Sequence, residues 1–105
     1  MVKNLILYGK SGFISSMLDS MAPIAEQLPD AGVVLMEDAI IGTSKASKPT
    51  PYQRLIEQKV PLYCVIEDLE ARGFDKDALL DQIKPVSYAD VIDMIEQAGR
   101  VVSWL

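Results

Sequence analysis

Five short apolar runs, separated by segments with helical spacing, constrain the fold of this chain more than any other feature. The runs cover residues 3–9, 32–36, 61–66, 84–86 and 101–105, and each has the length of a strand. Between them, above all over residues 13–28, apolar side chains recur on one helical face. Strands that alternate with helices predict a parallel sheet with right-handed crossovers. We therefore expect a single α/β domain over residues 1–105, doubly wound, with a mostly parallel five-stranded sheet and helices on both faces.

Local signals place the helix boundaries. Pro23 is expected to kink or restart the first helix, because proline lacks a backbone donor. Asp68 is expected to cap a short helix after the third strand. Residues 42–48 are small and polar, so they predict an exposed loop.

The last predicted helix follows Ser87, whose side chain can cap its N-terminus. Val91, Ile92 and Ile95 have helical spacing, and we expect all three to face the core.

Composition excludes several kinds of function. The chain has 15 acidic and 10 basic residues, so its net charge of −5 disfavours direct nucleic-acid binding. It has no histidine, which removes Ser–His and Cys–His nucleophile pairs and histidine metal sites. A single cysteine cannot form an internal disulfide, so a reducing, cytoplasmic setting is favoured. No apolar run has the length of a membrane span, and the apolar stretch near the N-terminus is too short for a signal peptide.

The turn after the first strand superficially resembles a phosphate-binding loop. That motif needs a glycine five positions before Gly9, where this chain has Asn4. We therefore predict a tight turn and no nucleotide site. No cofactor is predicted from any motif.

Four carboxylates follow two neighbouring predicted strands: Glu37, Asp38, Glu67 and Asp68. Ligands and catalytic groups gather at the carboxyl ends of parallel strands. Oxygen ligands of this kind suit a divalent cation, whereas acids after strands more often stabilise helix N-termini. We favour the helix-terminus interpretation and predict no metal site.

Cys64 lies near the carboxyl end of the third predicted strand, and two interpretations stay open. Free cysteine is often a small buried apolar residue, and its neighbours Tyr63 and Val65 favour that role. A thiol near a helix N-terminus could instead have a lowered pKa and act as a catalytic persulfide carrier. With no histidine present, such a thiolate would depend on backbone dipoles or on Lys10, Arg54 or Arg72.

Two residues are candidates for a subunit interface. Trp104, in the last predicted strand, either fixes that strand or contacts a partner. Met21, in the first helix, is either a core or an interface residue.

Taken together, the chain resembles the DsrH/TusB family of sulfur-relay subunits almost from end to end. The resemblance rests on five segments in the family's order: Lys10-Ser11-x-Phe13, Leu35-Met36-Glu37-Asp38-Ala39, Leu62-Tyr63 with Glu67-Asp68-Leu69-x-Ala71-Arg72-Gly73, Val86-Ser87-Tyr88-Ala89-Asp90-Val91, and Ser103-Trp104-Leu105.

This resemblance implies a subunit of a cytoplasmic hetero-oligomer that passes persulfide sulfur along a cysteine relay. The pathway is tRNA wobble 2-thiouridine formation or dissimilatory sulfur oxidation. The implied partners are DsrE/TusD-like and DsrF/TusC-like subunits and a DsrC/TusE-like sulfur acceptor. Without them the chain could form a homo-oligomer.

The chain departs from the family at one position. DsrH-type members can carry a cysteine in the first helix, where an ungapped match from Lys10-Ser11 places Met21. A thioether cannot form a persulfide, so we expect an assembly and docking subunit rather than a direct carrier. The alternative is a sulfurtransferase component that carries a persulfide on Cys64.

Overall fold

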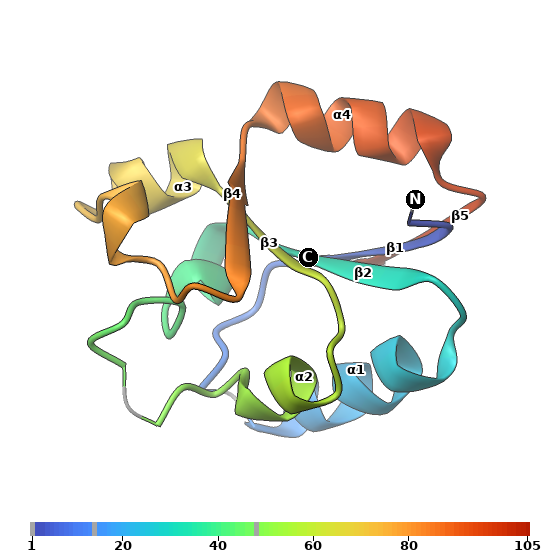
Figure 1. The fold of residues 1–105 in the computed structure, drawn as a ribbon, viewed down its shortest axis with the longest axis horizontal. Coiled ribbons are helices and arrows are strands. Elements are labelled where there is room, and N and C mark those ends of the chain that lie inside the picture. Colours follow the sequence, from blue (N-terminus) through green and yellow to red (C-terminus); the bar gives the residue numbers. More distant parts are fainter. Residues whose placement is uncertain (1, 14, 48) are drawn as a thin grey trace.

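A parallel five-stranded sheet forms the centre of the computed structural model, which describes residues 2–13, 15–47 and 49–105 (Figure 1). Its strands are β1 (Asn4–Tyr8), β2 (Ala31–Leu35), β3 (Leu62–Val65), β4 (Ile83–Val86) and β5 (Arg100–Trp104). They lie in the order β4-β3-β2-β1-β5, and all neighbouring pairs are parallel. The predicted doubly wound α/β fold is confirmed. Ile14 and Lys48, which fall in the predicted first helix and the predicted loop, lie outside the described residues.

Helices cover both faces of the sheet. The α-helices are α1 (Ser15–Gln27), α2 (Gln53–Glu57), α3 (Ile66–Ala71) and α4 (Tyr88–Gln97), and the short 3-10 turns are η1 (Glu37–Ile40) and η2 (Lys76–Ala78). In Figure 1, α1 and α2 lie on one side of the sheet and α4 on the other. The helix α3 begins directly where β3 ends.

Alternation along the strands builds a core on each side of the sheet. In β1, Ile6 and Tyr8 join the core beneath α1 and α2, whereas Leu5 and Leu7 join the core beneath α4. Apart from Leu7, at 8 % exposed, these side chains are fully buried. Apolar residues on both faces are typical of a parallel strand covered by helices, and they explain why the sequence shows continuous apolar runs.

Two local predictions differ from the structure. The helix α1 runs through Pro23 without a break, so the proline does not restart it, whereas a kink at Pro23 stays a prediction. The start of the predicted exposed loop is buried, and Thr43 is 0 % exposed. Its hydroxyl donates to Ile40 O at 2.6 Å, which satisfies the buried polar group.

The orientation of α4 differs from the prediction. Ser87 caps the helix as expected, in a capping box with Asp90. Val91 faces the core at 4 % exposure, but Ile92 and Ile95 are 56 % and 37 % exposed. The apolar arc of α4 is wider than the surface it covers, and the prediction that Ile92 and Ile95 face inward is wrong.

Among the described residues, no helix is both long enough and apolar enough to cross a membrane.

Candidate functional site

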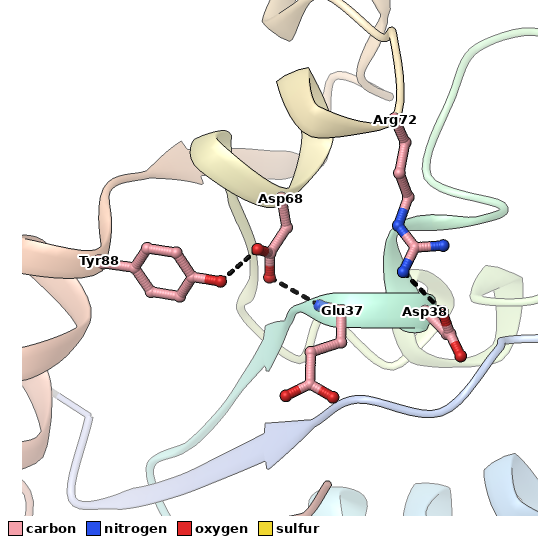
Figure 2. Close-up of polar contacts among 5 residues, drawn as sticks. All are labelled: Glu37, Asp38, Asp68, Arg72 and Tyr88. Carbon is pink, nitrogen blue, oxygen red and sulfur yellow. Dashed lines mark hydrogen bonds and ion pairs between the residues drawn. The ribbon is translucent and has the colours of Figure 1, made fainter.

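Polar side chains gather at the carboxyl edge of the sheet, where the sequence placed them (Figure 2). Glu37 and Asp38 follow β2 in η1, and Glu67 and Asp68 lie in the first turn of α3. Tyr88 is the first residue of α4, after β4. Because the strands are parallel, their ends bring these residues together.

Asp68 connects three elements at this edge. Its Oδ2 accepts a hydrogen bond from the backbone N–H of Glu37 at 2.7 Å. Its Oδ1 accepts the hydroxyl hydrogen bond of Tyr88 (Figure 2). The predicted capping role is wrong, because α3 begins at Ile66 with Val65 at its N-cap. Asp68 therefore lies inside the helix and joins α3 to η1 and α4.

Glu37 adopts a left-handed backbone conformation, with φ of 53°. A residue with a Cβ pays about 1 kcal/mol for this conformation. The hydrogen bond to Asp68 holds the Glu37 backbone in place. The Glu37 side chain lies beside Gly9, where an added Cβ would be 3.2 Å from Glu37 Oε2.

Tyr88 is held by two acids. Its backbone N–H donates to Glu67 Oε1 at 3.1 Å, and its hydroxyl donates to Asp68. The hydrogen bond to Asp68, partial burial and the surrounding carboxylates raise the pKa of Tyr88 to about 12. The phenol is therefore a hydrogen-bond donor at neutral pH. Local sequence patterns did not predict the bond between Tyr88 and Asp68.

Three of the four acids of this edge, Asp38, Glu67 and Asp68, accept hydrogen bonds or ion pairs from protein donors. Besides the bonds of Glu67 and Asp68, Asp38 Oδ1 pairs with Arg72 Nη2 at 2.5 Å. Within residues 2–13, 15–47 and 49–105, no three acidic or cysteine side chains converge as metal ligands would.

The loop after β1 is shaped by packing. Gly12 is buried, and a Cβ at this position would lie 2.7 Å from both Pro51 Cγ and Tyr52 Oη. Gly9 donates its N–H to Trp104 O at 2.8 Å, which ties the turn to β5. Close packing therefore accounts for the glycines of the motif that resembles a phosphate loop.

Cys64 lies in β3 between Leu35 of β2 and Pro85 of β4. Its side chain is 0 % exposed and belongs to the core beneath α1 and α2. Burial raises the pKa of the Cys64 thiol to about 12, and it outweighs the opposing effect of the neighbouring Thr43 hydroxyl. Desolvation therefore outweighs any effect of the nearby helix N-terminus, and Cys64 is a neutral thiol.

Two of the basic residues considered as thiolate partners, Arg54 and Arg72, are engaged elsewhere. Arg54 makes a two-pronged ion pair with Glu26, with N–O distances of 2.7 and 2.8 Å. Arg72 pairs with Asp38.

The two predicted interface residues differ in position. Met21 is 0 % exposed within the core, so its side chain leaves no surface for a partner. Trp104 is half-buried, packs against the same core and pairs with Tyr8 of β1. Trp104 thus packs the last strand against the core, and its contact with a partner stays a prediction.

Comparison with known proteins decides the family. The family described as "DsrH like protein" matches residues 10–101. The chain belongs to the DsrH/TusB family. Protein TusB of Erwinia tasmaniensis is similar to this DsrH/TusB chain, with 34 % identity over 76 residues, 69 % of this chain and 73 % of that protein. Family membership makes the chain a sulfur-relay-related subunit, and it implies a complex with other subunits.

Two solved structures share the fold of this DsrH/TusB chain. The ychN protein from E. coli superimposes with a TM-score of 0.79 at 21 % identity, over 98 % of this chain and 99 % of that one. A protein of unknown function from Methanobacterium thermoautotrophicum, MTH1491, superimposes with a TM-score of 0.65 at 13 % identity, over 95 % and 97 %. At these identities the similarity concerns the fold alone.

Proposed function

We propose that this chain is a non-carrier subunit of a cytoplasmic sulfur-relay complex that assembles and docks the subunits which carry sulfur. The observation behind this proposal is the state of Cys64, which is buried at 0 % exposure with its pKa raised to about 12. Sulfur transfer requires a thiolate that a donor persulfide can reach. Neither condition is met by this thiol.

The first helix supports the same role. Met21 stands where related DsrH-type chains can carry a cysteine, and it is fully buried. A buried thioether neither accepts nor releases a sulfane sulfur.

A docking role needs an exposed surface that can bind a partner. On α4, Tyr88, Ile92 and Ile95 are 38 %, 56 % and 37 % exposed. They are separated by four and three positions, so they form one stripe along the helix. The exposed apolar stripe is suited to the helix of another subunit. We infer that DsrE/TusD-like or DsrF/TusC-like subunits bind this surface and that a DsrC/TusE-like protein accepts the sulfur.

Intact mass after incubation with a persulfide donor tests the carrier question. We expect no sulfur addition to the folded chain. The Ala46→Cys variant provides a matched control, because Ala46 is exposed and its substitution adds an accessible thiol. Addition to the control but not to the natural chain supports the non-carrier role. A sulfur adduct on the natural chain that disappears in Cys64→Ser would instead establish the persulfide-carrier alternative.

Co-purification with the candidate partner subunits tests the docking role. Ile92→Ser together with Ile95→Ser is expected to reduce partner recovery strongly, while the melting temperature changes little because both side chains are exposed. Unchanged recovery would exclude the α4 stripe as the docking surface.

A further inference from the structure

The two edges of the sheet differ in their capacity to bind another strand. On one edge, β4 contains Pro85, which has no backbone N–H, and the exposed Lys84. Proline and lysine on an edge strand block strand addition. On the other edge, β5 has the sequence Arg100-Val101-Val102-Ser103-Trp104, with no proline and a single charged side chain.

The backbone groups on the outer side of β5 can be assigned from its pairing with β1. Arg100 N–H donates to Lys3 O at 3.0 Å, and Trp104 O accepts from Gly9 N–H at 2.8 Å, so both residues direct their backbone groups toward β1. Backbone groups alternate in direction along a strand. Val101 and Ser103 therefore direct their N–H and C=O groups outward, away from the sheet.

We propose that β5 pairs antiparallel with β5 of a second copy of this chain, about a two-fold axis at Val102. In this register Val101 lies opposite Ser103 of the second copy, and Ser103 lies opposite its Val101. Each is a pair that exchanges both backbone hydrogen bonds, which gives about four hydrogen bonds across the axis. Val101 and Ser103 lie on either side of Val102 at equal distances along the strand. A two-fold axis at Val102 therefore brings the outward groups of one copy opposite the outward groups of the other.

The side chains also favour a second copy as the occupant. On the face beneath α1, the same register puts Arg100 opposite Trp104 of the other copy. A guanidinium stacked on an indole is an attractive pair. Arg100 is the only charged side chain of β5, so no like charges meet directly across the edge although the chain carries a net charge of −5.

Other pairings of two copies are less favourable. A β5 edge joined to a β4 edge would meet Pro85 and its missing donor, and it would propagate as an open chain of subunits. The β5–β5 pairing is closed, because the same surface is used by both copies. This inference concerns the chain alone and does not depend on its role in sulfur relay.

Sedimentation or light-scattering mass measurements on the full chain test the proposal, from about 1 µM to about 1 mM. We expect a concentration-dependent dimer. Ser103→Pro removes an outward N–H from each copy without touching the bonds to β1, and it should weaken the dimer about tenfold to a hundredfold. Ser103→Ala keeps the N–H and should leave the dimer intact. A chain that stays monomeric throughout, or a dimer that tolerates Ser103→Pro, overturns the proposal.

Charged substitutions at Val101 and Ser103 distinguish loss of strand pairing from loss of the fold. The double variant Val101→Lys with Ser103→Lys sets lysines against lysines across the axis, and Val101→Glu with Ser103→Glu does the same with glutamates. Both residues are exposed, so each double variant should remain folded, as circular dichroism can verify. We expect each to be monomeric alone and the mixture to form a heterodimer. Failure of the mixture to associate contradicts the antiparallel register.

Discussion

Asp68 fixes the backbone of Glu37, which lies 31 residues earlier in the chain, through a hydrogen bond of 2.7 Å. The same carboxylate holds the hydroxyl of Tyr88 at the start of α4. One side chain thus joins the segments that follow β2, β3 and β4. The acidic edge is a structural connection between elements.

Removal of this carboxylate should cost stability. Asp68→Ala leaves the N–H of Glu37 without its acceptor in a left-handed conformation, and we expect a loss of about 1–3 kcal/mol in the free energy of unfolding. Urea denaturation measures it. Asp93→Ala, which removes an exposed carboxylate from α4, should change stability by less than about 0.5 kcal/mol. Equal losses in the two variants would contradict the assigned role of Asp68.

The titration of Tyr88 should report the same bond. Its pKa is raised to about 12, so its contribution to stability is complete below pH 10 and is lost as the pH rises toward 12. In Asp68→Asn the negative charge is gone, and the pKa of Tyr88 should fall toward its ordinary value. The ultraviolet absorbance of tyrosinate follows the titration, and Tyr88→Phe identifies its contribution. A titration that does not differ between the natural chain and Asp68→Asn would exclude this electrostatic coupling.

Cys64 should be protected from alkylation in the folded chain. Its buried thiol has a pKa of about 12, above the ordinary 9.0, so the thiol contributes to stability fully below pH 9 and loses that contribution toward pH 12. We expect the rate of reaction with iodoacetamide at neutral pH to rise strongly only when urea unfolds the chain. Rapid reaction without unfolding would show that the thiol is accessible.

Substitution of the same residue tests its packing. Cys64→Ser places a more polar hydroxyl in the core, and we expect it to lower the free energy of unfolding by about 1–3 kcal/mol. Denaturation curves at neutral pH measure this change. An unchanged midpoint would argue against full burial.

Two glycines should respond differently to alanine. A Cβ at Gly12 would meet Pro51 and Tyr52 at 2.7 Å, so Gly12→Ala should cost about 1–3 kcal/mol through overpacking. Gly73 has a φ of 83° and no atom within 4 Å of an added Cβ, so Gly73→Ala should cost only the conformational term of about 1 kcal/mol. Thermal unfolding separates the two. A larger loss of stability in Gly73→Ala than in Gly12→Ala would contradict this explanation.

The contrast between adjacent residues of α4 tests its orientation. Val91→Ala removes buried methyl groups and should cost about 1–3 kcal/mol, whereas Ile92→Ala should cost less than about 0.5 kcal/mol. Chemical denaturation of both variants is the measurement. Similar losses would show that Ile92 is as buried as Val91.

Sequence reasoning succeeded where one periodicity dominates. The alternation of strands and helices was sufficient to predict the parallel sheet, and it also placed Cys64 in the third strand. Ser87 was recognised as a cap because serine is a favoured N-cap residue and it directly precedes a segment with helical spacing. The capping box with Asp90 is added by the structure.

The failures arose where tertiary packing decides. The apolar residues of α4 include both Val91 and Ile92, and spacing alone does not say which part of a wide arc meets the sheet. Asp68 was misassigned because α3 starts at Ile66, three residues before the start that a cap at Asp68 predicts, with no polar cap to mark its beginning. The reach of Asp68 to Glu37 and Tyr88 depends on the order of the strands, which local patterns do not contain.

The position of β1 between β2 and β5 sets a time order for folding during synthesis. Asn4 pairs with Ala31 on one side and with Arg100 on the other, so its first neighbour is 27 residues away and its second is 96 residues away. As the ribosome works from the N-terminus, β1 and β2 are available early, but β1 waits for nearly the whole chain before its second neighbour is made. During that interval Leu5, Leu7 and the backbone beside them are exposed to other nascent chains. Rapid synthesis of the last helix and strand would shorten this interval, and a chaperone that covers β1 would shield the strand while it lasts.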